Sequence, residues 1–239
     1  MIHDVDEFLI GIAFGVRYRA NFAIEDQLGT IVDQILYSKN SYFNKHVFPL
    51  VERRVNEKVL IDPNTKDVLT INNSNIILEI NFSEKFNLSS IDDLIENFDR
   101  QIIDGVLKRF DITEIARVGF IKRYLFNIDK LAKNFIKKTI GQTLDGVNDI
   151  DLKFSRKFPV PESLTKKNIY DYDNAIFNII KRADKDELYI SVDYQKYFEP
   201  FLQSSVGINF QDFAKKANEF NSKNYLNWLN TNYSLKKNE

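Results

Sequence analysis

The sequence predicts an α+β protein made of two pseudo-symmetric copies of a β-α-β-β(-β)-α unit, with an antiparallel sheet covered on one face by helices. Two observations support this prediction. Strand-like and helix-like hydrophobic periods follow one another in the same order in both halves of the chain. Short motifs also recur at offsets that rise steadily along the chain. We expect one repeat over residues 1–112 and a second over 113–239, as two domains or as one continuous domain.

The first half begins with a predicted strand over residues 8–20. Its alternation places bulky residues on one face and small or basic residues on the other, namely Ile10, Ile12, Phe14, Val16 and Tyr18 against Gly11, Ala13, Gly15, Arg17 and Arg19. An amphipathic helix is predicted from Ile24 to Leu36, with Asn21 at its start. An antiparallel meander follows over 50–82, and a second helix runs from Ser89 or Ser90 to Phe110.

The second half repeats this order of elements. The predicted elements are a strand over 115–126, a helix over 129–140, an irregular stretch over 141–168, strands near 173–182 and 187–195, and a final helix over about 209–231.

Four pairs of matching segments favour an internal duplication of about 110 residues per copy. RYRANF at 17–22 returns as RYLFNI at 123–128, and FPLVE at 48–52 returns as FPVPE at 158–162. IILEINFSEKF at 76–86 matches LYISVDYQKYF at 188–198, and the last helices of the two halves also align. The opposing interpretation is that any two α+β halves share apolar patterning.

The composition narrows the classes of function. The net charge of −1 gives no global field that would draw the chain to nucleic acid or to an anionic membrane. The absence of cysteine excludes disulfides, thiolate nucleophiles and Cys-ligated metals, and His3 and His46 are the only imidazoles. No apolar run approaches the length of a membrane-spanning helix. We therefore expect a cytoplasmic protein that does not bind membranes.

Sequence motifs of common catalytic sites are missing. There is no HExxH, GxxxxGK[ST], GxGxxG or GxSxG pattern, and no nuclease arrangement of carboxylates and lysine can be assembled. The clustered acidic residues fall at predicted turns and helix starts, where carboxylates are normally solvated. We predict no catalytic residues, no metal and no cofactor, and these absences favour a protein without enzymatic activity.

The repeated Arg-Tyr motif supplies the candidate ligand-binding residues, which are Arg17, Arg19, Arg117, Arg123, Tyr18 and Tyr124. Arginines beside glycines and alanines leave room for a ligand, and arginines from the two first strands could converge on a carboxylate or phosphate. The alternative is that they pair with carboxylates such as Glu79 or Glu52 on neighbouring strands. Tyr18 and Tyr124 fit core positions better than catalytic ones. Asn21 and Asn127 fit helix caps.

Two further segments offer weaker binding features. Basic and aromatic residues alternate over 153–170, including Phe154, Phe158 and Tyr170, as in loops that bind single-stranded nucleic acid. A solvated charged surface explains the same pattern. The final helix carries Trp228, which would either complete the core or anchor a partner.

The connectivity is similar to that of the TATA-box-binding protein fold, itself a duplicated unit, but this resemblance concerns topology and implies no DNA binding. VLTINNSNIILEINF, the helix to Phe110 and ARVGFIKRYLFNI resemble the central region of a sporadically distributed family of uncharacterised bacterial proteins of about 250 residues. That family has an Arg-x-Gly-hydrophobic-x-x-Arg-Tyr strand, here with Arg117, Gly119, Phe120, Arg123 and Tyr124. The resemblance implies a mobile or defence-associated setting and no particular reaction.

These features lead to one main functional prediction and two alternatives. The main prediction is a non-enzymatic protein-binding or assembly protein, in a bacterial stress or phage-defence module, with a hetero-partner or a second copy of the chain. The first alternative is a sensor or enzyme that binds an anionic, nucleotide-like molecule through the paired arginines. The second alternative is binding of single-stranded nucleic acid, which we favour less.

Overall fold

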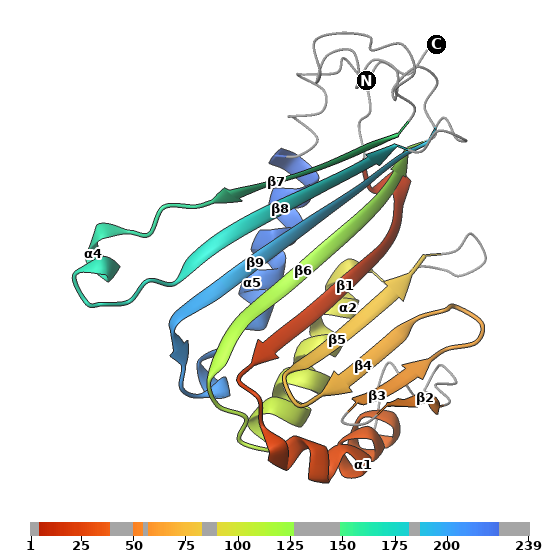
Figure 1. The fold of residues 1–239 in the computed structure, drawn as a ribbon, viewed down its shortest axis with the longest axis vertical. Helices are drawn as coiled ribbons and strands as arrows, with labels where there is room; N and C mark the ends of the chain where they lie inside the picture. Colours follow the sequence, from red (N-terminus) through yellow and green to blue (C-terminus); the bar gives the residue numbers. More distant parts are fainter. Residues whose placement is uncertain are drawn as a thin grey trace, which may run out of the picture.

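The computed structural model describes residues 5–38, 50–54, 57–82, 90–126, 149–181 and 187–224. It is an α+β structure with one nine-stranded sheet, in which every described pair of neighbouring strands is antiparallel (Figure 1). The strand order is β2-β3-β4-β5-β1-β6-β9-β8-β7, so the first strand of each half lies at the centre. The strands are β1 (Leu9–Tyr18), β2 (Leu50–Arg54), β3 (Glu57–Ile61), β4 (Val68–Asn72), β5 (Asn75–Asn81), β6 (Ile115–Phe126), β7 (Ile150–Lys157), β8 (Tyr172–Lys181) and β9 (Leu188–Leu202).

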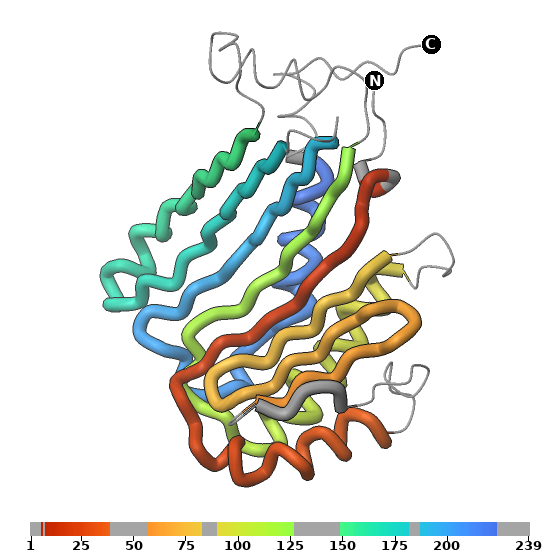
Figure 2. Tube along the Cα trace, turned by 45° about the vertical axis from the view of Figure 1, so that its right-hand side comes forward, coloured from red at the N-terminus to blue at the C-terminus, as the bar shows by residue number. Residues whose placement is uncertain are grey.

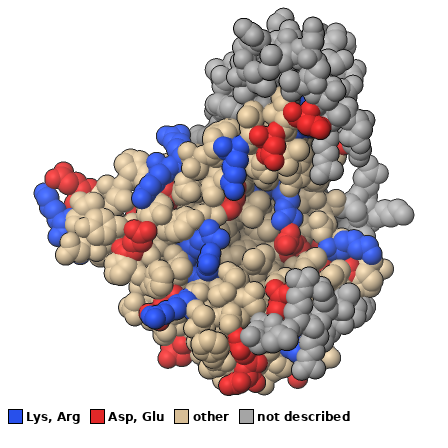
Figure 3. Space-filling model, in the orientation of Figure 1, with Lys and Arg blue, Asp and Glu red and all other residues tan. Residues whose placement is uncertain are grey.

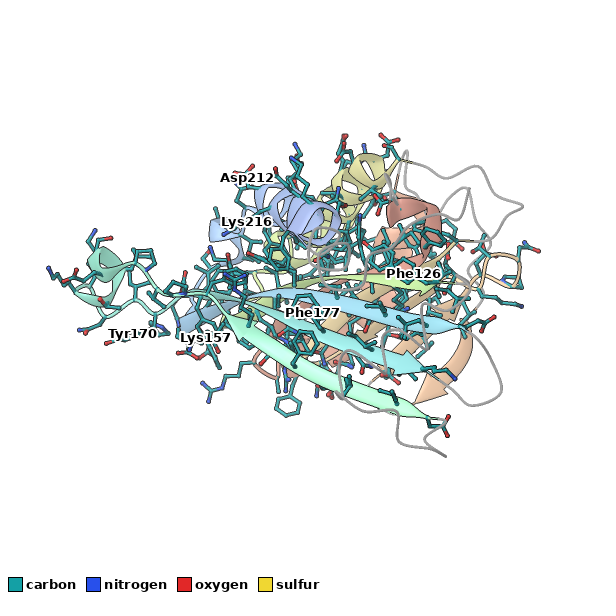
Figure 4. All side chains as sticks on the ribbon, turned by 90° about the horizontal axis from the view of Figure 1, so that it is seen from above. Phe126, Lys157, Tyr170, Phe177, Asp212 and Lys216 are labelled. Atoms are coloured by element: carbon teal, nitrogen blue, oxygen red, sulfur yellow. The ribbon has the colours of Figure 1, made fainter. Side chains whose placement is uncertain are left out.

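The main helices gather on one face of the sheet and leave the other face open (Figure 4). They are α1 (Phe22–Tyr37), α2 (Ile91–Phe98), the π-helix η3 (Asp99–Lys108), α5 (Phe210–Glu219) and the π-helix η5 (Phe220–Asn224). Short 3-10 turns, η1 (Val5–Phe8) and η4 (Ser205–Gly207), precede β1 and α5. The one-turn helix α4 (Glu162–Thr165) lies in the β7–β8 connection, which projects beyond the sheet with Tyr170.

The core lies between the sheet and the helices, and aromatic rings fill its centre. Phe14 of β1 packs on Phe120 of β6 with ring centroids 4.9 Å apart, and on Phe98 at 5.3 Å. Phe98 in turn contacts Phe210 of α5 at 4.8 Å. All four rings are almost fully buried, so this cluster joins both central strands to helices from both halves of the chain.

The predicted alternation of β1 is confirmed. Ile12, Phe14, Val16 and Tyr18 are buried beneath the helices, and Arg17 is exposed on the open face. The predicted helix starts are also confirmed. The Asn21 side chain accepts a hydrogen bond from the Ala23 amide at 3.0 Å, and Ser90 accepts one from the Asp93 amide at 3.1 Å.

Three elements differ from the prediction. The stretch 141–168 was expected to be irregular, but β7 forms there as an edge strand. The meander over 50–82 forms four strands, more than the predicted unit contains, because LVERRVNEKVLI forms both β2 and β3. The second helix becomes a π-helix after Phe98, whose wider turn brings Gln101 and Ile103 into the core beside Ile102.

Other predictions fall partly outside the described residues. The helix over 129–140, Asn127, His3, His46 and Trp228 lie outside them, and the final helix is described only to Asn224. The two halves share one sheet and one core. Outward from the centre, the order is β1-β5-β4-β3-β2 on one side and β6-β9-β8-β7 on the other, as the tube in Figure 2 shows. Among the described residues the first half contributes five strands and the second half four, and the duplication stays a prediction.

Candidate functional site

A hollow lies in the open face of the sheet, over the ladder between the central strands β1 and β6. Its floor contains Gly15 and Gly119, which are directly opposite each other in this ladder. Because neither residue has a side chain, the floor there is backbone. The hollow has a volume of about 430 Å³, which includes space that is open to solvent. Figure 3 looks onto this face, where basic side chains are interspersed with acidic ones.

Two arginines stand at one end of the hollow. Arg17 of β1 and Arg117 of β6 are direct cross-strand partners, and both line the hollow. Directly opposed residues have Cβ atoms only about 5 Å apart, and like charges in this arrangement repel. The Arg17 side chain is exposed, and no hydrogen bond or ion pair joins its guanidinium to any other described residue. Arg17 is therefore available to a ligand.

Arg117, in contrast, is held in place by neutral groups of β9. Its Nη1 donates to the Tyr197 hydroxyl at 3.0 Å and to Gln195 Oε1 at 3.3 Å. The guanidinium also lies 5.7 Å from the centre of the Tyr197 ring. Tyr197 stacks on Tyr172 of β8, whose other face is covered by the Lys157 ammonium at 3.6 Å. This row of rings fixes Arg117 without neutralising its charge.

Asp193 of β9 lies at the other end of the hollow, on the same face. Burial raises the pKa of its carboxyl, while a hydrogen bond from Gln195 and the charges of Arg117 and Lys153 oppose this effect. Gln195, which is only 4% exposed, uses Nε2 to donate to Asp193 Oδ2. Arg117, Gln195 and Asp193 thus form one polar network along the wall of the hollow.

The two other predicted arginines have carboxylate partners. Arg123 Nη2 pairs with Glu79 Oε2 at 2.6 Å, which confirms the cross-strand alternative for this residue. Arg19 Nη1 pairs with Glu114 Oε1 at 2.9 Å near the surface. The structure therefore brings together Arg17 and Arg117 but not all four arginines.

The two predicted tyrosines lie in the core rather than in the hollow. Tyr18 is 2% exposed and Tyr124 is fully buried, both on the helix-covered face. The Tyr18 hydroxyl donates to the Asn72 carbonyl oxygen at 2.6 Å, and burial raises its pKa. Their structural interpretation is confirmed by burial, and neither residue contacts the hollow.

The basic segment over 153–170 is partly engaged within the fold. Phe158 packs against the buried Tyr194 ring at 5.7 Å and against Phe220 at 5.5 Å. The Arg156 guanidinium lies over the Phe158 ring, 5.0 Å from its centre. Phe154 and Tyr170 remain 42% and 44% exposed. The segment therefore offers fewer free aromatic faces than its sequence suggests.

Neither a cluster of metal ligands nor a membrane-spanning helix is found in the described part of the chain. Within it, no three His, Cys, Asp or Glu side chains come together as a metal site. No helix in those same ranges combines the length and apolar character needed to cross a bilayer.

The residues on the β9 side of the hollow were not predicted as site residues. Asp193, Gln195 and Tyr197 occupy alternate positions of β9, opposite buried apolar residues on its other face. This alternation of polar side chains in LYISVDYQKYF is the signal in the sequence that could have identified them. Their position beside Arg117 depends on strand register, which the sequence does not state.

Comparisons with known proteins add no functional assignment. No protein-family profile matches the chain, and no curated protein matches it significantly. The residues of the hollow are therefore the basis for a functional proposal.

Proposed function

We propose that this protein is a binding protein that recognises an anionic group, a carboxylate or a phosphate, in the hollow between β1 and β6. The observation that supports this proposal is the direct pairing of Arg17 with Arg117 at the hollow. Arg117 is bonded to the neutral acceptors Gln195 and Tyr197, and Arg17 has no acceptor among the described residues. An anion placed between the two guanidinium groups would relieve their repulsion.

The two arginines would have different roles in such a site. Arg117 is pre-positioned by two hydrogen bonds and by the Tyr197 ring, so little conformational entropy would be lost when it binds. Arg17 is exposed and would close on the ligand from the other strand. Asn75, which is opposite Arg17 on β5 and also lines the hollow, adds an amide to the same end.

The groups around the hollow favour recognition over catalysis. Guanidinium and amide groups orient an anion through hydrogen bonds. Apart from the Asp193 carboxylate, which accepts a hydrogen bond from Gln195, the remaining lining is glycine, alanine and larger apolar residues. We therefore propose a non-enzymatic role. We propose a partner protein in a bacterial stress or defence module as the carrier of the anion, with a free nucleotide-like molecule as the alternative.

The proposed duplication would explain the origin of this site. If the two halves descend from one ancestral unit, their first strands meet in the β1–β6 ladder. The hollow would then have formed where the two copies join. This origin is part of the proposal, and the binding test below does not depend on it.

The test uses sulfate as the first probe, because it carries charge and oxygen acceptors but no other feature. A ligand that binds only the folded state raises its unfolding temperature in a concentration-dependent way. We expect sulfate to do so, and to shift NMR signals of residues around Gly15 and Gly119. Arg17→Gln and Arg117→Gln should each weaken both effects at least about fivefold, since each removes a charge-assisted hydrogen bond.

Arg19→Gln is the matched control, because it removes another exposed arginine, whose partner is Glu114, outside the hollow. Equal loss in all three variants would indicate a general charge effect and would contradict the proposal. Nucleoside monophosphates and phosphorylated peptides, titrated in parallel, distinguish a free small molecule from an anionic group on a protein.

A further inference from the structure

Asp193 presents one carboxylate oxygen to the hollow. Its Oδ2 accepts a hydrogen bond from Gln195 Nε2. Its Oδ1 lies 3.6 Å from the position that a Cβ on Gly119 would occupy, so this oxygen faces the glycine floor. No hydrogen bond to Oδ1 is formed by any other described residue. A ligand on the floor would meet this oxygen.

The hydrogen-bond direction along the wall is fixed by Arg117. Arginine can only donate, and both Arg117 Nη1 and the Tyr197 hydroxyl donate to Gln195 Oε1. The amide of Gln195 must therefore direct Nε2 toward Asp193. As a result, Asp193 Oδ2 already accepts a hydrogen bond from Gln195, and Asp193 Oδ1 is the acceptor for the ligand.

The floor between these two ends is flat and weakly polar. Gly119 lies midway between Arg117 and Ile121, the residue opposite Asp193. These four residue steps span about 13 Å of strand. Ile77 and Ile121 border the glycine pair in the hollow and add apolar surface on either side. Arg117 Nη1 lies 3.3 Å from Oε1 of Gln195, the residue opposite Gly119, so the guanidinium occupies part of this span and the remaining length suits a single ring.

We infer that the ligand is a small aromatic or heteroaromatic acid, with its anionic group on Arg17 and Arg117 and an N–H donor at the far end of the ring on Asp193. This inference rests on the proposed anion site and specifies its ligand class. Burial of Asp193 supports the assignment, because a shielded acceptor discriminates strongly between a donor and an apolar group.

The test compares 4-aminobenzoate with 4-methylbenzoate, which have the same charge and nearly the same shape. Binding is followed by NMR titration of the folded chain, with sulfate as the reference anion. We expect wild-type protein to bind 4-aminobenzoate about tenfold more tightly than 4-methylbenzoate, as one hydrogen bond to a buried carboxylate predicts. Asp193→Asn should remove this preference, because the amide oxygen would stay on Gln195 Nε2 and its NH₂ group would face the ligand amine.

Asp193→Ala provides a second variant that removes the acceptor, and thermal unfolding checks that both variants fold. Affinity for 4-methylbenzoate should be retained or should rise in either variant, because loss of the Asp193 charge favours an anion near Arg117, and this separates ligand discrimination from general damage. If sulfate binds but the two benzoates bind equally or not at all, the anion site stands and this ligand class is overturned. If neither sulfate nor the benzoates bind, both proposals fail.

Discussion

Arg123 on β6 pairs with Glu79 on β5 at 2.6 Å, although β1 lies between these two strands. The residues of β1 opposite the pair are Gly11 and Ala13, which are small enough for the side chains to meet above the strand. The small residues of β1 thus have two uses on the open face: toward one end they allow this crossing, and Gly15 forms part of the floor of the hollow.

Gly11→Ala should destabilise the protein. A Cβ at this position would lie 2.8 Å from the Ile80 carbonyl oxygen, which is fixed in the β1–β5 ladder. We expect a loss of about 1–3 kcal/mol in the free energy of unfolding, measured by urea denaturation. Gly29→Ala is the control, because a Cβ there meets no atom within 4 Å in the exposed part of α1. That change should stabilise by about 0.5–1 kcal/mol, and equal effects at both sites would contradict this account.

Arg123→Gln should leave anion binding intact. Arg123 is engaged with Glu79 and does not line the hollow, whereas Arg17 does. Because the two partners are 24% and 37% exposed, loss of the ion pair should cost less than about 1 kcal/mol of stability. Sulfate titrations of Arg123→Gln and Arg17→Gln would show the contrast. A site that needs Arg123 as much as Arg17 would have a different location from the one proposed.

Lys122 should tolerate replacement better than its partner Asp6. Lys122 is fully buried, and its Nζ contacts Asp6 Oδ1 at 2.9 Å and Ser222 Oγ at 3.0 Å. Asp6→Ala should cost about 3 kcal/mol, because it removes a carboxylate from contact with a buried ammonium. Lys122→Met should cost about 1 kcal/mol or less, since an apolar side chain of similar size replaces the charge. Urea denaturation of both single variants and the double variant measures these losses of stability. A larger loss for Lys122→Met than for Asp6→Ala would contradict this expectation.

Asp193 should make stability and anion affinity depend on pH. Its pKa is raised by burial against the opposing effects of Gln195 on the same strand, Arg117 on β6 and Lys153 on β7. The folded state therefore retains this proton to higher pH than the unfolded state, and stability falls as pH rises from about 4 through the folded-state pKa. Asp193→Asn lacks this fall. Its stability relative to the wild-type protein should therefore increase over that pH interval and then stay constant.

Sulfate affinity should follow the same titration, because protonation of Asp193 removes a negative charge near Arg117. We expect tighter sulfate binding on the acidic side of the interval in the wild-type protein, and a flatter profile in Asp193→Asn. Parallel profiles for the two proteins would show that another group controls the dependence.

Local features of the fold were predictable because they depend on neighbouring residues. The inward and outward faces of β1, the bounds of β6 and the caps at Asn21 and Ser90 follow from alternation and side-chain chemistry. β7 was missed because IDLKFSRK is an exposed edge strand, and an edge strand does not need an apolar face. The π-helix after Phe98 was missed because its apolar spacing also suits an ordinary helix.

The pairing within the site could not be predicted, because it depends on the register of two distant strands. The repeated motif aligns Arg17 with Arg123, but antiparallel strands run in opposite directions. With Phe14 opposite Phe120, the residue three positions after Phe14 meets the residue three positions before Phe120, which is Arg117. Arg123 is then opposite Gly11, at the other end of the ladder.

An open sheet of this kind has two free margins, and β7 forms one of them. In the described part of the chain no strand pairs with its outer peptide groups, and Lys153, Arg156 and Lys157 crowd this margin with positive charge. Two molecules that approached margin to margin would repel each other before their backbones could join. The same charged residues that prevented the prediction of β7 from the sequence would thus keep the protein from polymerising through its sheet.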